Sequence, residues 1–229
     1  MNERENILGR IREALSLPAP IPGAHHGEPS HPVSECDAAA HIPEWLPRVG
    51  VTFEEQIALF RTNATELKAD FLLLDSQEEL VAKLREIAAA EGWKKVATHS
   101  HELTDDACAA LGLPMVRTDN GYEARDMESC DVGISACDAL IAQTGSVLVT
   151  SQSAGGRALS VLPPHHVVLA RREQLIADLP SAFALLKTKY ASGYPSLISF
   201  ITGPSRTGDI ERILVLGAHG PKKLTILCV

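Results

Sequence analysis

Two short segments late in the chain carry side chains suited to holding a small anion and moving a proton. Residues 199–211 read SFITGPSRTGDIE and include Arg206, and residues 217–229 read GAHGPKKLTILCV and include His219. A guanidinium can clamp a carboxylate or phosphate through two parallel hydrogen bonds, and a histidine gains or loses a proton near neutral pH. The sequence therefore predicts an anion site here, although Arg206 could instead form an ion pair with an acid of its own segment.

The glycines of the first segment invite comparison with a nucleotide-binding P-loop. Gly203 and Gly208 have the right spacing, but Asp209 and Ile210 stand where a P-loop has Lys and Ser or Thr, so the main phosphate ligand is missing. The apolar run before Gly203 predicts a strand, and the acids after the loop predict a helix start. Such a loop is expected at the carboxyl edge of a sheet, where ligands usually bind. Three polar residues of the loop could instead cap the helix: Ser205, Thr207 and Asp209.

Polar residues upstream could complete the same pocket. Residues 155–157, Gly-Gly-Arg, join a cation to flexible backbone, and His165 and His166 precede an apolar strand. Such a histidine could be a general acid or base, or could only satisfy a loop carbonyl, and residues 155–157 could be a surface turn. If the loops meet at one edge, the candidate catalytic residues are His165, His219 and Asp209. The candidate ligand-binding residues are then Thr144, Gly145, Ser146, Arg157, His166, Gly203, Pro204, Ser205, Arg206, Thr207 and Gly220.

Other histidines raise the question of a metal site. His99 and His101 directly follow a predicted strand, as paired ligands do in some metal hydrolases, but no acid or third histidine has an evident place beside them. Four more histidines fall within residues 18–50 without fixed spacing. The sequence therefore predicts polar loops at both places and no metal site.

Composition narrows the class of protein. Hydrophobic residues make up 45% of the 229 residues, enough for one α/β domain with a full core. A net charge of -8 with no basic run argues against nucleic acid as a partner. No leader or membrane-spanning run is visible, so a cytoplasmic location and no membrane partner are expected. The five cysteines contain no C-x-x-C pair, and no flavin or nicotinamide motif is present, so no cofactor is predicted in this chain.

The periodicity of apolar residues predicts how these motifs are positioned. An amphipathic helix over residues 2–17 and a Pro/His-rich arm form an N-terminal region, residues 1–50. Residues 51–229 form one α/β domain in which helices and short strands alternate, as in parallel βαβ units. The runs 139–142 and 146–150 are close enough for a hairpin, so the sheet is expected to be mixed, mostly parallel with an antiparallel portion.

The motifs resemble the lactate utilization protein C family, whose shared module is called the LUD domain. The resemblance rests on GPSRTGDIE followed by GAHGPKKLTIL, with ALIAQTGS at 139–146, Arg157, and LPPHH at 162–166. It is close over the later part of the chain and looser upstream. It implies a three-layer α/β fold similar to the ribose-5-phosphate isomerase (RpiA), glucosamine-phosphate deaminase (NagB) and CoA-transferase group.

The resemblance also implies a function. In that family this chain would be the cluster-free component of a cytoplasmic system that oxidises L-lactate to pyruvate, while partner subunits carry the iron–sulfur clusters. The side chains of the predicted pocket suit binding of a small carboxylate or another anionic ligand. One alternative is a freestanding enzyme like a CoA-transferase or formyltetrahydrofolate cyclo-ligase, using CoA or a nucleotide-activated acid. Its glutamate nucleophile motif is not visible, and Asp138 is merely the nearest acid. The other alternative is a non-catalytic assembly subunit.

Overall fold

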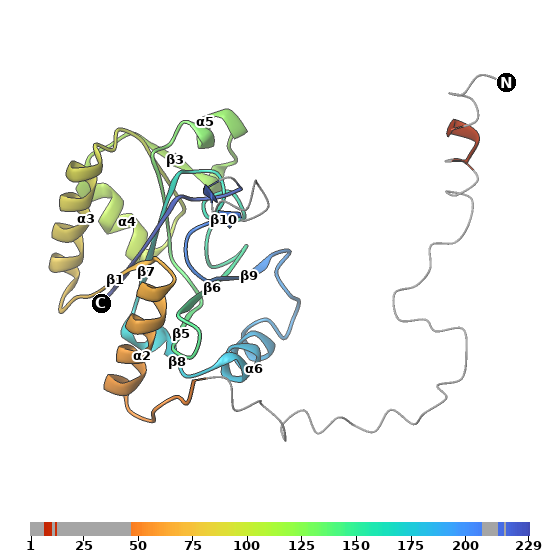
Figure 1. Ribbon diagram of the computed structural model, residues 1–229. Helices are drawn as coiled ribbons and strands as arrows, with labels where there is room; N and C mark the ends of the chain where they lie inside the picture. The colour runs from red at the N-terminus through yellow and green to blue at the C-terminus, as the bar shows by residue number, and fades with distance from the viewer. Residues whose placement is uncertain (1–6, 11, 13–46, 208–214, 218) are drawn as a thin grey trace, which may run out of the picture. The chain divides into compact units, whose positions relative to one another are not determined.

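A six-stranded parallel sheet forms the centre of the fold (Figure 1). Each pair of neighbouring strands runs parallel, so all six begin at one edge, called here the amino edge, and end at the opposite carboxyl edge. This confirms the predicted α/β class with a parallel sheet. In spatial order the strands are β1 (Asp70–Leu73), β12 (Lys223–Cys228), β7 (His165–Ala170), β4 (Val132–Ser135), β2 (Val96–Thr98) and β3 (Met115–Arg117).

A second sheet packs against the first. The predicted hairpin is present, but its strands belong to a separate four-stranded sheet rather than to an antiparallel portion of the parallel one. The reason lies in its two apolar faces: Leu140 and Val147 pack toward the parallel sheet, whereas Ile141 and Leu148 pack on the other side. In order, the strands are β8 (Leu175–Ile176), β5 (Ala139–Ile141), β6 (Ser146–Thr150) and β9 (Ile198–Ile201).

Helices cover the outer faces of both sheets. α3 (Gln77–Glu91) and α4 (Glu102–Leu111) cover one face of the parallel sheet, and α6 (Leu179–Lys189) covers the second sheet (Figure 1). α2 (Phe53–Glu66) packs beside the second sheet, and α5 (Ala124–Glu128) follows β3. Local signals set these helices: Ser76 caps α3 and Gly92 ends it in the left-handed conformation, as the sequence predicts.

Alternation along β7 places two histidines on opposite faces of the parallel sheet. Val167 and Leu169 belong to the core beneath α3 and α4, and His165 lies on their side of the strand. Val168 belongs to the core shared with the second sheet, and His166 lies on that side. Both histidines are within the first two residues of the strand, at the amino edge.

The computed structural model describes residues 7–10, 12, 47–207, 215–217 and 219–229. The chain divides into two compact units, Met1–Glu44 and Trp45–Val229. In the first, residues 7–10 and 12 are helical, within the helix predicted for residues 2–17, and the remainder of that prediction and the Pro/His arm lie outside the described residues. Within the described part of the chain, no helix is both long and apolar enough to span a bilayer.

Candidate functional site

The loop that carries Arg206 lies at the amino edge of the parallel sheet. It follows β9, which runs antiparallel to β6 in the second sheet and therefore ends where β6 begins. A Cβ atom on Gly203 would lie 2.5 Å from the carbonyl oxygen of Leu67, in the connection that enters β1. The predicted position at the carboxyl edge is therefore wrong, because the strand before the loop belongs to the second sheet.

The two late segments with the anion-binding side chains are joined by their backbones. The amide of Ser205 donates to the carbonyl of Pro221 at 2.9 Å, and the amide of Gly217 donates to the carbonyl of Ser205 at 2.9 Å. A two-stranded ladder continues this contact, formed by β10 (Arg206–Thr207) and β11 (Val215–Leu216). Ser205 is thus positioned by the second segment, and Arg206 and Thr207 lie in a strand rather than in the predicted loop.

Arg206 presents its guanidinium beside the Gly203 turn. Gly203 has a φ of +89°, and its missing Cβ would lie 3.4 Å from Nη2 of Arg206, so glycine lets the arginine fold over the turn. Pro204 beside it is buried, and Arg206 itself is exposed. The neighbouring candidate Asp209 and the predicted helix start lie outside the described residues.

The β5–β6 turn reaches the same edge. Gly145 has a φ of +63°, and a Cβ there would lie 2.6 Å from the amide nitrogen of Ala64 in α2. The Oγ atoms of Ser146 and Thr202 are hydrogen-bonded at 2.8 Å, which joins the turn to the end of β9. Thr144 has a buried hydroxyl with no partner in the described part of the chain. The turn thus supports the Gly203 loop and offers one free hydroxyl.

The remaining candidates of the second segment also lie at this edge. His219 is exposed, and Gly220 passes so close to Ser205 that a Cβ on it would lie 3.1 Å from the Cβ of Ser205. The amide of Lys222 donates to the carbonyl of Pro164 at 2.8 Å, which places the segment next to the start of β7. The amino edge therefore gathers most of the predicted residues.

His165 opens into a cavity of about 470 Å³ beneath α3. Its Nε2 is hydrogen-bonded to Oγ1 of Thr225 at 2.9 Å, its ring meets Trp93 edge-on, and its buried Nδ1 has no partner among the described residues. Burial lowers the pKa of His165 to about 4, so the ring is neutral at pH 7. The same cavity is lined by the ion pair of Lys223 and Glu91, whose Nζ and Oε1 atoms are 2.6 Å apart. His165 can therefore exchange hydrogen bonds with a bound molecule.

His166 and Arg157 lie apart from the residues gathered around Arg206. His166 is at the amino edge but on the other face of the sheet, and Arg157 is at the carboxyl edge. His166 is 1% exposed on the opposite face, where its Nε2 is hydrogen-bonded to Oγ of Ser135 at 2.9 Å, and burial lowers its pKa to about 3. Arg157 is in the loop after β6, and its Nη2 donates to the carbonyl of Ser196 at 2.7 Å. That loop passes His99 at the carboxyl edge, because a Cβ on Gly155 would lie 2.3 Å from the Cβ of His99. The predicted single pocket is thus divided between two edges.

The family model of the LUD domain matches residues 57–229 of this chain. The chain belongs to the LUD domain family. This confirms the family predicted from the motifs.

Relatives of this LUD-domain chain align over most of its length. Lactate utilization protein C of Geobacillus sp. (strain WCH70) is 27% identical over 207 residues, covering 82% of this chain and 84% of the relative. The protein of the same name from Shouchella clausii (strain KSM-K16) is 27% identical over 238 residues, covering 100% and 98%. A crystal structure of a DUF162 family protein from Deinococcus radiodurans superposes with a TM-score of 0.61 at 16% identity, covering 79% of this chain and 99% of that one. This structural likeness supports the fold.

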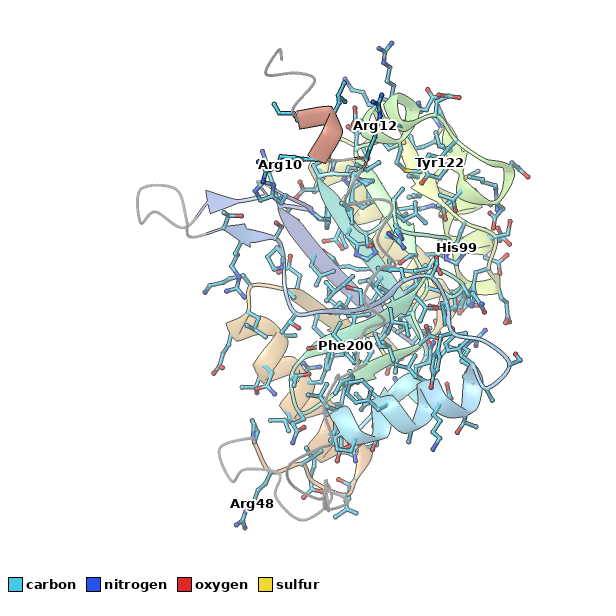
Figure 2. All side chains as sticks on the ribbon, turned by 90° about the vertical axis from the view of Figure 1, so that its right-hand side faces the viewer. Arg10, Arg12, Arg48, His99, Tyr122 and Phe200 are labelled. Atoms are coloured by element: carbon cyan, nitrogen blue, oxygen red, sulfur yellow. The ribbon has the colours of Figure 1, made fainter. Side chains whose placement is uncertain are left out.

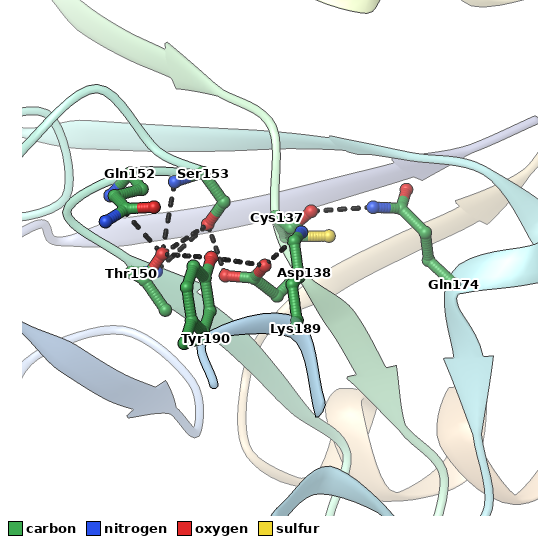
Figure 3. A network of polar contacts seen from close by, with 8 residues as sticks. All are labelled: Cys137, Asp138, Thr150, Gln152, Ser153, Gln174, Lys189 and Tyr190. Atoms are coloured by element: carbon green, nitrogen blue, oxygen red, sulfur yellow. Dashed lines mark hydrogen bonds and ion pairs between the residues drawn. The ribbon is translucent and has the colours of Figure 1, made fainter. Parts of the chain in front are cut away.

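A buried carboxylate of the LUD domain was not among the predicted site residues. Asp138 follows β4 at the carboxyl edge, and its side chain is wholly buried (Figure 3). Oδ1 accepts from Nζ of Lys189 at 2.5 Å and from the hydroxyl of Tyr190 at 2.8 Å, and Oδ2 accepts from Oγ of Ser153 at 2.5 Å. The one available signal was an acid between two apolar runs. Three donors satisfy the carboxylate, so it holds the β4–β5 corner to the end of α6 rather than standing free as a nucleophile.

The paired histidines after β2 bond to the backbone. Nε2 of His99 accepts from the amide of Ala136 at 3.1 Å, and Nδ1 of His101 accepts from the amide of Leu103 as the N-cap of α4. Within the described residues, no group of three or more His, Cys, Asp or Glu side chains is placed to hold a metal ion. The contacts give each of these two histidines a structural role.

Proposed function

We propose that this LUD-domain protein is the component without iron–sulfur clusters of a cytoplasmic system that oxidises L-lactate to pyruvate. The observation that carries the proposal is the alignment of relatives named lactate utilization protein C over 82–100% of the chain. Oxidation of lactate removes two electrons and two protons, and the five cysteines of this chain include no C-x-x-C pair of the kind that binds clusters. Partner subunits therefore take the electrons, and this chain contributes binding.

The amino edge is the proposed binding site for a small carboxylate such as lactate. Arg206, Lys222 and His219 are exposed there, on two segments whose backbones are fixed to each other. A guanidinium held over the Gly203 turn can bind a carboxylate by donating two parallel hydrogen bonds to its oxygens. Thr144 adds a hydroxyl that lacks a partner among the described residues. In this proposal the arrangement orients the acid for a reaction completed by partner subunits.

The test is L-lactate-dependent reduction of an artificial electron acceptor. The chain alone, the co-purifying iron–sulfur subunits alone, and the two together are compared. Activity is expected only in the combined sample, and Arg206→Ala should abolish most of it. Arg48→Ala is the matched control, because Arg48 is also an exposed arginine but precedes α2 (Figure 2). Equal activity with and without this chain would rule the proposal out.

A non-catalytic assembly role is the second candidate, favoured by an apolar surface beside β9. Phe200 of β9 (Figure 2) packs on Phe183 of α6 with ring centroids 5.6 Å apart. Phe183 is 59% exposed, and Tyr194, nearby in sequence, is 63% exposed. β9 is an edge strand, and such strands can pair with another chain. In this case Arg206→Ala would retain activity, whereas Phe183→Asp would lose the partner subunits on purification.

A further inference from the structure

A second cavity, of about 300 Å³, lies at the carboxyl edge, away from the site proposed above. Three loops enclose it. His99 and Ser100 follow β2, Thr118 and Asp119 belong to the short 3-10 helix (Thr118–Asn120) after β3, and the third loop follows β6. Two of these loops follow strands of the parallel sheet at their carboxyl ends, the usual position of ligands in open α/β sheets.

The walls of this cavity are polar. Hydroxyls come from Ser100, Thr118 and Ser151, and Gln152 adds an amide. The Oγ1 atom of Thr118 is buried and has no hydrogen-bond partner in the described part of the chain. Leaving a buried hydroxyl unpaired is costly, so a molecule that pairs with it gains stability. The wall therefore favours a ligand rich in hydrogen-bonding groups over an apolar one.

Two glycines shape the loop after β6 around the cavity. Gly155 has a φ of +63°, and a Cβ on it would lie 2.3 Å from the Cβ of His99 and 2.7 Å from Oγ1 of Thr118. The loop backbone is thus pressed against the wall. Gly156 has a φ of +99° and lines the cavity, yet a Cβ on it would meet no atom within 4 Å. Its backbone therefore borders open space that a ligand can approach.

The charge of the lining argues against an anion. Oδ2 of Asp119 accepts the amide hydrogen of Ser100 at 2.7 Å, and although partial burial raises the pKa of Asp119, hydrogen bonds from Ser100 bring it below its usual value. The neighbouring Arg117 is paired with Asp105, with Nη1 2.6 Å from Oδ1. Burial lowers the pKa of His99, which is therefore neutral at pH 7. Among the described residues that line the cavity, Asp119 carries the one charge. The adjacent Arg117, whose Nη1 also donates to Oγ of Ser100 at 3.2 Å, already has Asp105 as its ion-pair partner.

We propose that this carboxyl-edge cavity binds a neutral small molecule with several hydroxyl groups, of the size of a monosaccharide. Each ligand hydroxyl both donates and accepts, which matches a wall of alternating hydroxyl, amide and carboxylate groups. Asp119 accepts ligand hydroxyls through its free oxygen, and Thr118 gains the partner it lacks. This site is separate from the amino-edge carboxylate site and does not depend on it.

The test is a ligand-observed NMR titration of the full chain with D-glucose as the probe. Saturable binding is expected, weakened at least about tenfold in Asp119→Asn because a charge-assisted hydrogen bond is lost. Thr118→Val should weaken binding several-fold and leave the thermal midpoint equal or higher, because the hydroxyl it removes has no partner among the described residues. The matched controls are Asp126→Asn and Thr62→Val, exposed residues of α5 and α2.

Glucose 6-phosphate tests whether the cavity prefers a neutral ligand to an anionic one. It should bind more weakly than glucose, because its phosphate meets Asp119. Absence of saturable binding would overturn the proposal, as would tighter binding of the phosphate ester. Thr118→Val binding glucose as well as the natural protein would overturn it too, and this variant keeps the test decisive if Asp119→Asn fails to fold.

Discussion

The two edges of the parallel sheet are built by different means. At the amino edge, Gly145, Gly203 and Ser205 each bring the backbone of their loop into close contact with another segment, and cationic side chains such as Arg206 remain exposed. At the carboxyl edge, side chains are tied to one another, with Asp138 buried among three donors. The amino edge is thus fixed mainly by backbone contacts that leave side chains free, whereas at the carboxyl edge bonds between side chains add to the close approach of Gly155 to His99. Substitutions should accordingly act differently at the two edges.

The largest effect on stability is expected when the pH is lowered, because two buried histidines at the amino edge, His165 and His166, then take up protons on unfolding. In the unfolded chain both titrate near pH 6.5, but burial lowers the pKa of His165 to about 4 and of His166 to about 3. The unfolded state then binds more protons below about pH 6.5, so stability is complete above that pH and falls as the pH drops. Lowering the pH from about 7.5 to 5 should therefore reduce the free energy of unfolding by on the order of 4 kcal/mol through these two histidines.

Urea unfolding at both pH values measures this loss. His166→Gln should lose about half of the pH dependence, since one of two titrating groups is removed. An unfolding free energy that is equal at the two pH values would contradict the burial of these histidines.

The next effect tests the carboxyl edge. Asp138→Ala should lower the free energy of unfolding by roughly 3 kcal/mol, because Ser153 and Tyr190 lose their acceptor in a buried place. Chemical denaturation measures this loss, and the control is Lys187→Ala, an exposed residue of α6, the helix that ends beside Asp138. A loss no greater than that of the control would mean that side-chain bonds do not hold this edge.

A pair of glycine substitutions compares the backbones of the two edges. Gly145→Ala combines a φ of +63° with a Cβ 2.6 Å from a backbone nitrogen and should cost at least about 2 kcal/mol. Gly156→Ala has a strained φ but open space around its Cβ, so about 1 kcal/mol is expected. Thermal unfolding of both variants shows which of them loses more stability. A larger loss in Gly156→Ala than in Gly145→Ala would contradict the proposed difference between the two edges.

The smallest effect on stability is expected at Arg206. Arg206→Ala should change the free energy of unfolding by no more than about 0.5 kcal/mol, like Arg48→Ala, because its side chain is exposed. Only Arg206→Ala should lower lactate-dependent activity. A thermal midpoint lowered as far as in a core truncation would make Arg206 a structural residue.

Local signals in the sequence were sufficient for the elements but not for their arrangement. Ser76 and Gly92, a capping serine and a terminating glycine, bound α3, and the apolar run after His166 is a central strand. The hairpin was recognised, yet its assignment to a second sheet depends on packing between segments far apart in sequence. The same limit explains the misplaced Arg206 loop, since a strand's direction is set by its partners. It also explains Asp138, whose donors come from two distant parts of the chain, the loop after β6 and the end of α6.

The sequence predicts which residues belong to the candidate site better than it predicts how they are arranged. His165, His219, Arg206 and the Gly203 turn were predicted together, and the structure places them at one edge. Arg157 is predicted to join them because two glycines beside a cation let the backbone approach a ligand, but its guanidinium donates to the carbonyl of Ser196. Sequence patterns name side chains suited to a task, whereas their convergence depends on long-range pairing.

The position of β12 has a consequence for synthesis on the ribosome. β1 pairs with β12 and with no other strand of the described chain, and β12 also separates β1 from β7. Among the described strands, β1 therefore has no partner on either side until residues 223–228 have been translated. Parallel pairings of this range close slowly and leave apolar surface open to aggregation. Chaperone capture of nascent chains is accordingly expected to persist until β12 has left the exit tunnel.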